Sequence, residues 1–495
     1  MSDSVSPAAR RSFIPAAGVA LTIAVSILQA GPASAASATS RPGGGQVAVP
    51  SISCPSARDC TAAGFLLPPG ENFAFLASET GGSWRKAEKV PGTSALPGRN
   101  RRAVLNAVSC SAPGSCGAGG FYVDRARHTQ AFVLSEKDGV WGKAKQVPGT
   151  AVLNVGGKAS VDVMSCRSAG DCTAAGTYFA AAKNDKQAFV VSEKNGRWGT
   201  AEEIPGLASL TSSAADVNVL SCSSPGNCVV GGDYHVNAGE FNAAGSEPFV
   251  VSQRNGAWGL MQTFPAIKAV NTAGISSING LSCRSAGTCL AAGTYRTFNG
   301  HDHVFSIAER DGTWGAFRPI PGMAALPGGG EFTATIANVS CPSAGDCAVG
   351  GTYSDGSLFG LPFLATQKNG TWGKARALPG VEGLGQGPVA DLTAVSCPTA
   401  GNCTAVGDYT VNATTFSELA YVVSEKNGKW GQAQTLPGAK ALSKHGELGP
   451  EALACGAPGD CAVGGIYFVA NGLEAPFVAT QQNGTWSKAE RLPGT

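Results

Sequence analysis

Two of the five histidines flank an aspartate in the segment His301-Asp302-His303. Alternate residues of an extended strand point to the same side, so these imidazoles could ligate a metal ion, with His235 contributed by the preceding copy of a repeat. A solvent-exposed loop explains the same residues without an ion. We therefore predict no metal site and no cofactor.

Seven acidic residues lie in segments that differ between the repeats and could supply a general acid and a general base. Such catalysis needs two carboxyl groups at a defined separation, which a sequence does not provide. We interpret these residues as ordinary polar loop residues and predict no catalytic residue. They are Asp124, Asp185, Glu240, Glu247, Asp302, Asp355 and Glu418.

Tyrosine recurs at one position of the repeat, and Leu66 takes its place in one copy. A ring of exposed tyrosines could stack sugars, whereas a residue present in nearly every copy is typical of packing between repeats. We favour packing, and we interpret the repeated tryptophans, Trp84 through Trp486, as structural too. The tyrosines are Tyr122, Tyr178, Tyr234, Tyr295, Tyr353, Tyr409 and Tyr467.

The variable segments provide the candidate ligand-binding residues, because binding residues usually lie in loops held by a rigid scaffold. These segments cover residues 122–128, 234–247 and 295–303, and a small basic cluster runs from Arg99 to Arg102. The predicted ligand-binding residues are Tyr122, Arg125, His128, Tyr234, His235, Glu240, Tyr295, Arg296, His301 and His303.

All sixteen cysteines fall into eight pairs whose members are six positions apart. An even number of cysteines in regular pairs is the pattern of a disulfide framework. A structural zinc site would need closer spacing and two pairs or histidines brought together. We predict no free thiol and the disulfides Cys54–Cys60, Cys110–Cys116, Cys166–Cys172, Cys222–Cys228, Cys283–Cys289, Cys341–Cys347, Cys397–Cys403 and Cys455–Cys461.

The cysteine pairs mark eight copies of a repeat with a period of 56 to 61 residues. Each copy contains four strand signals: a strand ending at the first cysteine, a strand from the second cysteine, an apolar strand, and a strand that starts at a tryptophan. Asn-Gly pairs such as Asn195-Gly196 join the last two strands, because a type I′ turn needs positive φ at both residues. A proline seven residues after every tryptophan ends the copy.

Small residues in the first two strands and a large aromatic residue in the last suit a β-propeller blade, whose strands are most crowded near the axis. We predict an all-β, eight-bladed propeller over residues 46–495, with four-stranded antiparallel blades and one disulfide in each blade. Packing of the first blade against the last would close the ring without a shared strand. A β-solenoid or two smaller modules are the alternatives. The repeats start near 46, 104, 160, 216, 277, 335, 391 and 449.

The first 35 residues have the layout of an export signal: Arg10-Arg11, an apolar run, and Ala33-Ser34-Ala35. We predict cleavage before Ala36, a flexible segment over 36–45, and secretion by the general or the twin-arginine route. No later segment approaches the ~20 apolar residues of a membrane span.

The charge of the chain argues against polyanionic partners. Lysine and arginine number 36 and aspartate and glutamate 34, for a formal net charge of +2. Nucleic-acid binding would need a basic face or stripe, and the chain has no such run. We predict no nucleic-acid partner and expect a monomer.

The hairpin of the form Ser-x-x-Asn-Gly-x-Trp resembles the Asp-box propellers of sialidase-like proteins. The whole repeat resembles more closely the secreted bacterial propeller repeats with a Ser-Cys-Pro-Ser…Cys signature, as in Ser340 to Ser343 followed by Cys347. The Asp-box aspartate is replaced, as in Ser192 to Trp198, and the sialidase Arg-Ile-Pro motif is absent. The resemblance implies the propeller fold and provides no active site.

These observations together predict a secreted, non-catalytic binding module for a protein or glycan partner. Its binding face would be formed by the connections between the second and third strands and between successive repeats. A glycan hydrolase or lyase with a site at the propeller mouth is the main alternative, and an extracellular structural scaffold is another.

Overall fold

The structure is a computed structural model that describes residues 46–67, 73–180, 186–209, 214–236, 245–327, 333–354, 360–385, 389–412, 417–444, 446–469 and 473–495, without the side chains of 98–101. The predicted export signal and the predicted flexible segment lie outside these ranges. Within them, no helix is long and apolar enough to cross a membrane.

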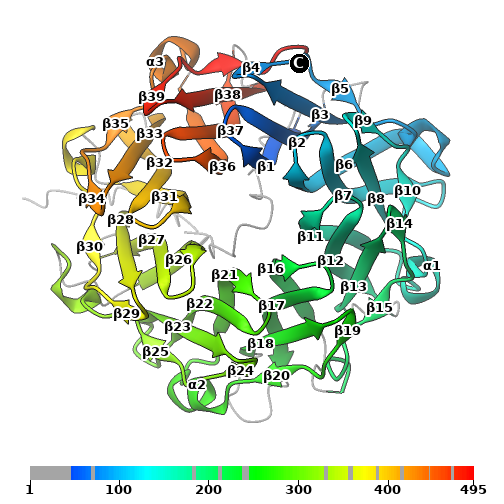
Figure 1. Ribbon diagram of the computed structural model, residues 1–495, viewed down its shortest axis with the longest axis horizontal. Coiled ribbons are helices and arrows are strands. Elements are labelled where there is room, and N and C mark those ends of the chain that lie inside the picture. The colour runs from blue at the N-terminus through cyan, green and yellow to red at the C-terminus, as the bar shows by residue number, and fades with distance from the viewer. Residues whose placement is uncertain are drawn as a thin grey trace, which may run out of the picture. The chain divides into compact units, whose positions relative to one another are not determined.

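Eight antiparallel sheets form a ring around a central axis, as the prediction of an eight-bladed propeller required (Figure 1). The first strand of each blade lies nearest the axis (Figure 1). These inner strands are β1 (Gln46–Ser56), β6 (Gly98–Ala112), β11 (Ala159–Ser168), β16 (Ala215–Ser224), β21 (Ser276–Ser285), β26 (Thr333–Ser343), β31 (Ala390–Thr399) and β36 (Leu448–Ala457).

Two further long strands complete the body of each blade. The second strands are β2 (Asp59–Leu67), β7 (Ser115–Asp124), β12 (Asp171–Phe179), β17 (Asn227–Val236), β22 (Thr288–Arg296), β27 (Asp346–Ser354), β32 (Asn402–Asn412) and β37 (Asp460–Phe468). The third strands are β3 (Phe73–Thr80), β8 (Thr129–Lys137), β13 (Lys186–Lys194), β18 (Gly245–Arg254), β23 (Asp302–Arg310), β28 (Gly360–Lys368), β33 (Ser417–Lys426) and β38 (Glu474–Gln482).

The outer strand of each blade is broken into two short pieces that both pair with the third strand. The sequence predicted one strand running from the tryptophan. The pieces are β4 (Ser83–Trp84) and β5 (Glu88–Lys89), β9 (Val140–Trp141) and β10 (Lys145–Gln146), β14 (Arg197–Trp198) and β15 (Glu202–Glu203), β19 (Ala257–Trp258) and β20 (Gln262–Thr263), β24 (Thr313–Trp314) and β25 (Arg318–Pro319), β29 (Thr371–Trp372) and β30 (Arg376–Ala377), β34 (Lys429–Trp430) and β35 (Gln434–Thr435), and β39 (Thr485–Trp486) and β40 (Glu490–Arg491).

Short helical turns connect some blades. They are α1 (Thr150–Leu153), α2 (Pro265–Val270) and α3 (Ala439–Leu442), with 3-10 turns at Thr93–Ala95, Met323–Ala325 and Val381–Gly383. Between the third and outer strands, Asn195 and Gly196 have φ of 51° and 77°, as the type I′ turn requires.

The eight predicted disulfides all form, each between the first and second strands of one blade. They define one end of every blade, which we call the disulfide end; the turns between the third and outer strands lie at the same end. The opposite end, where the second strand leads to the third and one blade leads to the next, is called the loop end.

A hydrogen bond between inner strands joins neighbouring blades near the axis. The serine just before the first cysteine of one blade accepts the backbone N–H of the first cysteine of the next, at 2.9–3.2 Å, at seven junctions. The Ser-Cys dipeptide of the repeat therefore serves the contact between blades as well as the disulfide. The last blade has Ala454 at this position, so its junction with the first blade lacks the serine hydroxyl.

A second recurring hydrogen bond joins the blades at their outer edge. The proline carbonyl that ends one blade accepts the N–H of a residue in the break of the next outer strand, as between Ala201 and Pro148 at 2.7 Å. This bond explains the break, because the backbone must turn from its own sheet to reach the neighbouring blade.

The same outer bond closes the ring. Ala87 of the first blade donates to the carbonyl of Pro493 in the last, at 2.7 Å. Near the axis, the Glu451 carboxylate of the last blade accepts the Val49 N–H of the first at 2.5 Å. The first and last blades are separate sheets, so packing closes the ring without a shared strand, as predicted.

The hydrophobic core lies between the blades. Each third strand buries one large aromatic residue, which is phenylalanine in seven blades and Tyr421 in blade 7, and none of these side chains is accessible to solvent. Several tryptophan indoles donate across the seam to a hydroxyl of the preceding blade, as Trp198 does to Ser135 at 3.0 Å. These bonds support a structural role for the tryptophans that make them, although the rings are partly exposed.

We predict that Ser221→Ala destabilises the propeller by about 1 kcal/mol, because the buried N–H of Cys283 loses its acceptor. Urea or guanidinium unfolding of the oxidised protein measures the loss. The matched control is Ala454→Ser, which adds a hydroxyl where the repeat lacks one and should not destabilise. Equal stability of Ser221→Ala and the wild type would contradict this role for the serine.

Candidate functional site

The seven repeated tyrosines at the loop end are buried, from 1% to 9% exposed, and so is Leu66, which takes the same position in the first copy. Tyr122 donates to Gln146 at 3.2 Å, and burial, followed by the nearby Asp124, raises the pKa of Tyr122 to about 12. The interpretation of these residues as packing between blades is confirmed, and Tyr122, Tyr234 and Tyr295 present little surface to a ligand.

The loop after β7 is held by Asp124. Its carboxylate accepts the backbone N–H groups of Ala126 and His128 at 2.8 and 2.9 Å, and lies 3.8 Å from the His128 imidazole. Arg125 and His128 are exposed beside it. The Asp124 carboxylate therefore stabilises the conformation of this loop, and the side chains of the predicted residues Arg125 and His128 are exposed to solvent.

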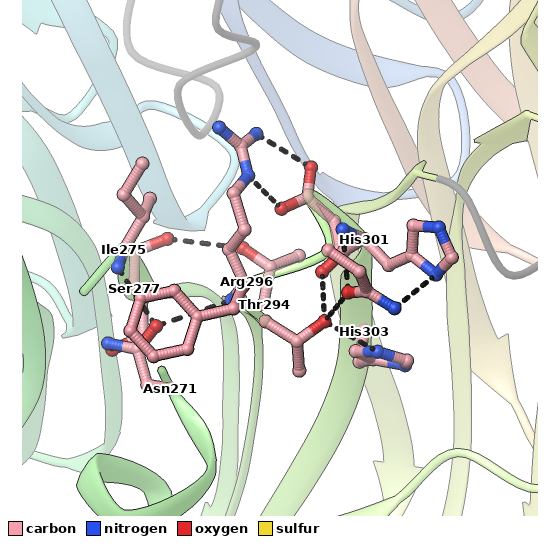
Figure 2. Close-up of polar contacts among 12 residues, drawn as sticks. Asn271, Ile275, Ser277, Thr294, Arg296, His301 and His303 are labelled. Atoms are coloured by element: carbon pink, nitrogen blue, oxygen red, sulfur yellow. Dashed lines mark hydrogen bonds and ion pairs between the residues drawn. The ribbon is translucent and has the colours of Figure 1, made fainter. Parts of the chain in front are cut away.

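Arg296, His301 and His303 each contact neighbours in or beside the loop after β22 (Figure 2). Arg296 makes two hydrogen bonds to Asp302, at 2.6 and 2.8 Å. The His303 ring stacks on Tyr295 with centroids 5.1 Å apart, and His301 Nδ1 lies 3.1 Å from the Asn299 amide. The aspartate and the two imidazoles of His301-Asp302-His303 thus have separate neighbours.

His235 belongs to a different cluster. Its imidazole and the carboxylates of Asp216 and Asp233 place one metal-ligating atom each within 4.8 Å of one another, the one such group of three among the described residues. Burial, followed by Asp216, raises the pKa of Asp233 to about 7. Tyr234, between Asp233 and His235, points into the core.

Three residues named from the sequence lie outside the described residues: Glu240, Asp185 and Asp355. Glu247 is described and is buried, and burial raises its pKa.

Blade 7 brings carboxyl groups together that the sequence analysis did not pair. Asp391 of β31 lies directly opposite Asp408 of β32, and Glu418 follows on β33 opposite Thr410. Burial, then Glu447 and Asp391, raise the pKa of Glu418 to about 7; burial also raises the pKa of Asp408, followed by Asp391 and Glu418.

A sequence signal for these carboxylate pairs exists. Only blades 4 and 7 contain Ala-Asp-Val or Ala-Asp-Leu in the inner strand together with Gly-Asp-Tyr in the second strand. The two aspartates face each other across the strands in both blades. Aligning the repeats at the cysteines and asking which second-strand position changes from threonine to aspartate would have found both pairs.

Four cavities lie at the disulfide end, between neighbouring blades. They have volumes of about 290 Å³ between blades 1 and 2, 420 Å³ between blades 2 and 3, 630 Å³ between blades 3 and 4, and 440 Å³ between blades 5 and 6. Binding was predicted at the loop end, and no role was predicted for the disulfide end.

Three of these cavities have the same construction. The second cysteine and the glutamate or glutamine near the end of the third strand line each cavity from both blades. The next blade adds the Gly-containing turn between its first two strands, and lysine or arginine side chains lie around the opening. These paired acidic or amide residues are Glu79 and Glu136, Glu193 and Gln253, and Glu309 and Gln367.

The equivalent space between blades 4 and 5 is nearly filled, with a volume of about 10 Å³. Arg254 crosses this junction and donates to the Gly312 carbonyl at 2.5 Å and to the Glu309 carboxylate at 3.3 Å. The aligned residue is Thr80 in blade 1 and Lys194 in blade 3. Blade 5 has Arg310 at the same position, but the next blade has Gln367 in place of a glutamate and that junction stays open. The arginine and the glutamate of the next blade together therefore fill a junction.

At this position near the end of the third strand, five blades have glutamate and three have glutamine. Glu425 is 6% exposed, and its Oε2 has no hydrogen-bond partner within the described part of the chain. Burial raises its pKa. The aligned Gln481 instead donates its amide to Ser424 of the preceding blade at 3.1 Å.

No protein-family model and no curated protein matches this sequence. Among solved structures, the β-propeller domain of the Trilobed protease from Pyrococcus furiosus is 8% identical, with a TM-score of 0.41 over 78% of this chain and 97% of that domain. A fucose-specific lectin from Aleuria aurantia is 11% identical, with a TM-score of 0.33 over 67% of this chain and 95% of the lectin. An ulvan lyase of family PL25 is 11% identical, with a TM-score of 0.40 over 80% of this chain and 94% of the lyase. Likenesses this distant do not indicate what the chain binds, and the fold is established by its own strand pairing.

We predict that Glu425→Gln stabilises the protein by about 1 kcal/mol at pH 7 and has little effect at pH 4. A carboxyl group whose pKa is raised by folding costs stability as the pH rises above its ordinary value of 4.5. The variant amide removes that cost and can donate as Gln481 does. Thermal unfolding at both pH values tests this, with Gln481→Glu as the control of opposite sign. A gain that is the same at both pH values would contradict the explanation.

Proposed function

We propose that this protein is a secreted, non-catalytic binding module whose inter-blade cavities at the disulfide end bind hydroxyl-rich glycan ligands. The observation that supports this most is the recurrence of one cavity at successive junctions, because one blade sequence then provides several equivalent sites. Volumes of about 300–1,000 Å³ are typical of small-molecule sites. Eight disulfides also suit an oxidising, extracellular compartment.

The chemistry of the lining favours a sugar over a protein surface. A sugar presents hydroxyl groups that both donate and accept hydrogen bonds, together with an apolar face. The cavity between blades 1 and 2 offers Thr61 and Ser78 hydroxyls, exposed Arg85 and Lys86 at the opening, and the apolar edge of Trp141. Sites repeated around a ring would bind a repeating polymer with avidity even where each site is weak.

The variable segments at the loop end remain a predicted second binding surface. Among the described members of the predicted set, Arg125 and His128 are exposed, and His235, Arg296, His301 and His303 are partly exposed. A partner protein at this end would leave the cavities unused, so the two surfaces are separable by mutation.

The test combines a glycan array with calorimetry on the best ligand. We predict more than one equivalent site per chain, and that Thr80→Arg removes one site. The new arginine would cross the junction between blades 1 and 2 toward Glu136, as Arg254 reaches Glu309. For the larger cavity, the double variant Lys194→Arg with Gln253→Glu reproduces the same pair of residues.

Thr80→Ser is the matched control and should keep the full number of sites. The proposal fails if no glycan binds, which would favour the structural scaffold. It also fails if the variants filling the cavities keep every site, which would place binding at the loop end.

A second candidate function is glycan cleavage, either by hydrolysis or by the elimination reaction of a lyase. The carboxyl groups of blade 7 favour it. A group that keeps its proton near neutral pH beside an ionised neighbour is what a general acid and base require. Glu418, with a pKa of about 7, can hold or release a proton near neutral pH, and it lies beside Asp391 and Asp408, whose pKa values burial also raises.

For this alternative we predict that Asp408→Thr lowers polysaccharide cleavage by about 100-fold or more. Blades 3, 5 and 6 have threonine at this position, so the variant should fold. Asp233→Thr in blade 4 is the matched control. Reducing-sugar release and unsaturated-product absorbance distinguish hydrolysis from lysis. Wild-type protein that releases neither product would rule the alternative out.

A further inference from the structure

The cluster of Asp216, Asp233 and His235 at the loop end of blade 4 has no role in the proposed binding function. Asp216 is in the inner strand β16 and the other two residues are in β17. One ligating atom of each lies within 4.8 Å of those of the other two. Donor atoms on a shared ion bound at about 2.0–2.2 Å lie about 3–4.4 Å apart, so a small adjustment would bring all three onto one ion.

Strand geometry produces this arrangement. Asp216 and Asp233 are direct cross-strand partners in the antiparallel register. Asp233 and His235 are alternate residues of β17, so their side chains leave the same face of the sheet. Asn218, in the same inner strand as Asp216, donates to Asp233 Oδ1 at 2.9 Å and orients its carboxylate.

Comparison of the blades separates this cluster from a simple acidic patch. Blade 7 has the same pair in Asp391 and Asp408, but Thr410 occupies the position of His235. Blades 3, 5 and 6 have serine or threonine at both aspartate positions. Blade 4 alone combines the two carboxylates with an imidazole, the nitrogen ligand that transition metals favour.

A lysine from the neighbouring blade contacts the same cluster. Lys186, the first residue of β13, forms an ion pair with the Asp216 carboxylate. One ammonium faces three carboxylates, because Lys186 also opposes the rise in the pKa of Asp233 and of the buried Asp162. The cluster therefore already attracts a cation, and a divalent ion would compete with Lys186 for Asp216.

We propose that Asp216, Asp233 and His235 form a binding site for a divalent transition-metal ion, Zn²⁺ or Mn²⁺. Two carboxylate oxygens and one imidazole nitrogen suit these ions better than Ca²⁺ or Mg²⁺, which favour all-oxygen sites. Three protein ligands would leave a coordination position open to water or to a ligand from outside.

The test is isothermal titration calorimetry of the metal-stripped, folded protein with Zn²⁺, Mn²⁺ and Ca²⁺ separately. We expect one site for Zn²⁺ or Mn²⁺ and at least about tenfold weaker binding of Ca²⁺. His235→Thr and Asp233→Thr introduce residues that sister blades have at these positions, and each should weaken binding by about tenfold or more.

Lys186→Ser gives a prediction of opposite sign. Removing the competing ammonium should tighten metal binding, and the aligned residue of blade 4 is Ser246. Asp408→Thr in blade 7 is the control that should leave binding unchanged. Unfolding temperatures without metal show that each variant is folded.

The proposal is overturned if the folded wild type binds neither Zn²⁺ nor Mn²⁺, or if binding survives both His235→Thr and Asp233→Thr. Binding that is lost in Asp408→Thr but kept in Asp233→Thr would move the site to blade 7 and also overturn it. None of these results bears on glycan binding at the disulfide end, so the two proposals can fail separately.

Discussion

The hydrogen bond from the first cysteine N–H of one blade to the serine of the blade before it is the contact on which the ring depends. Inner strands meet closest to the axis, where there is little room for large side chains. A serine hydroxyl is small enough to fit there and still satisfies a backbone donor of the next blade, which would otherwise lose a hydrogen bond on burial. The disulfide beside it holds the donor strand to its own neighbour in the blade.

Two recurring hydrogen bonds between neighbouring blades determine where cavities can exist. The inner serine bond and the outer proline bond hold neighbouring blades together near the axis and at the rim. Between them the blades diverge, and buried aromatic residues fill most of the space. Toward the disulfide end, where this filling stops, Arg254 and its partner Glu309 fill one junction. Thr80 and Lys194 leave their junctions open, and so does Arg310, which has Gln367 opposite it in place of a glutamate.

Most of the fold could be predicted from the sequence because the recurring residues of the repeat act within a single blade. Cysteine pairs, Asn-Gly turns and the terminal proline each have a meaning within one blade, and the eight disulfides follow from them. The broken outer strand could not be predicted, because its cause is the bond from Ala201 to Pro148 in another blade. The cavities were missed for the same reason: each is lined by residues about one repeat apart, and their relative placement appears only when the blades are assembled.

For the residues predicted at the loop end, the sequence likewise indicated their position within a blade but not their contacts in the folded protein. Those that the structure describes lie at the loop end, but the tyrosines are buried between blades and Arg296 is bound to Asp302. Blades 4 and 7 differ from the rest at positions where the scaffold accepts serine or threonine, so neither packing nor turn geometry requires aspartate there. Burial, together with the facing carboxylate, raises the pKa of Asp233 and of Asp408, so ionised aspartates there raise the free energy of the folded state. A cost that the other blades avoid with neutral residues is best explained by something that the aspartates bind or do.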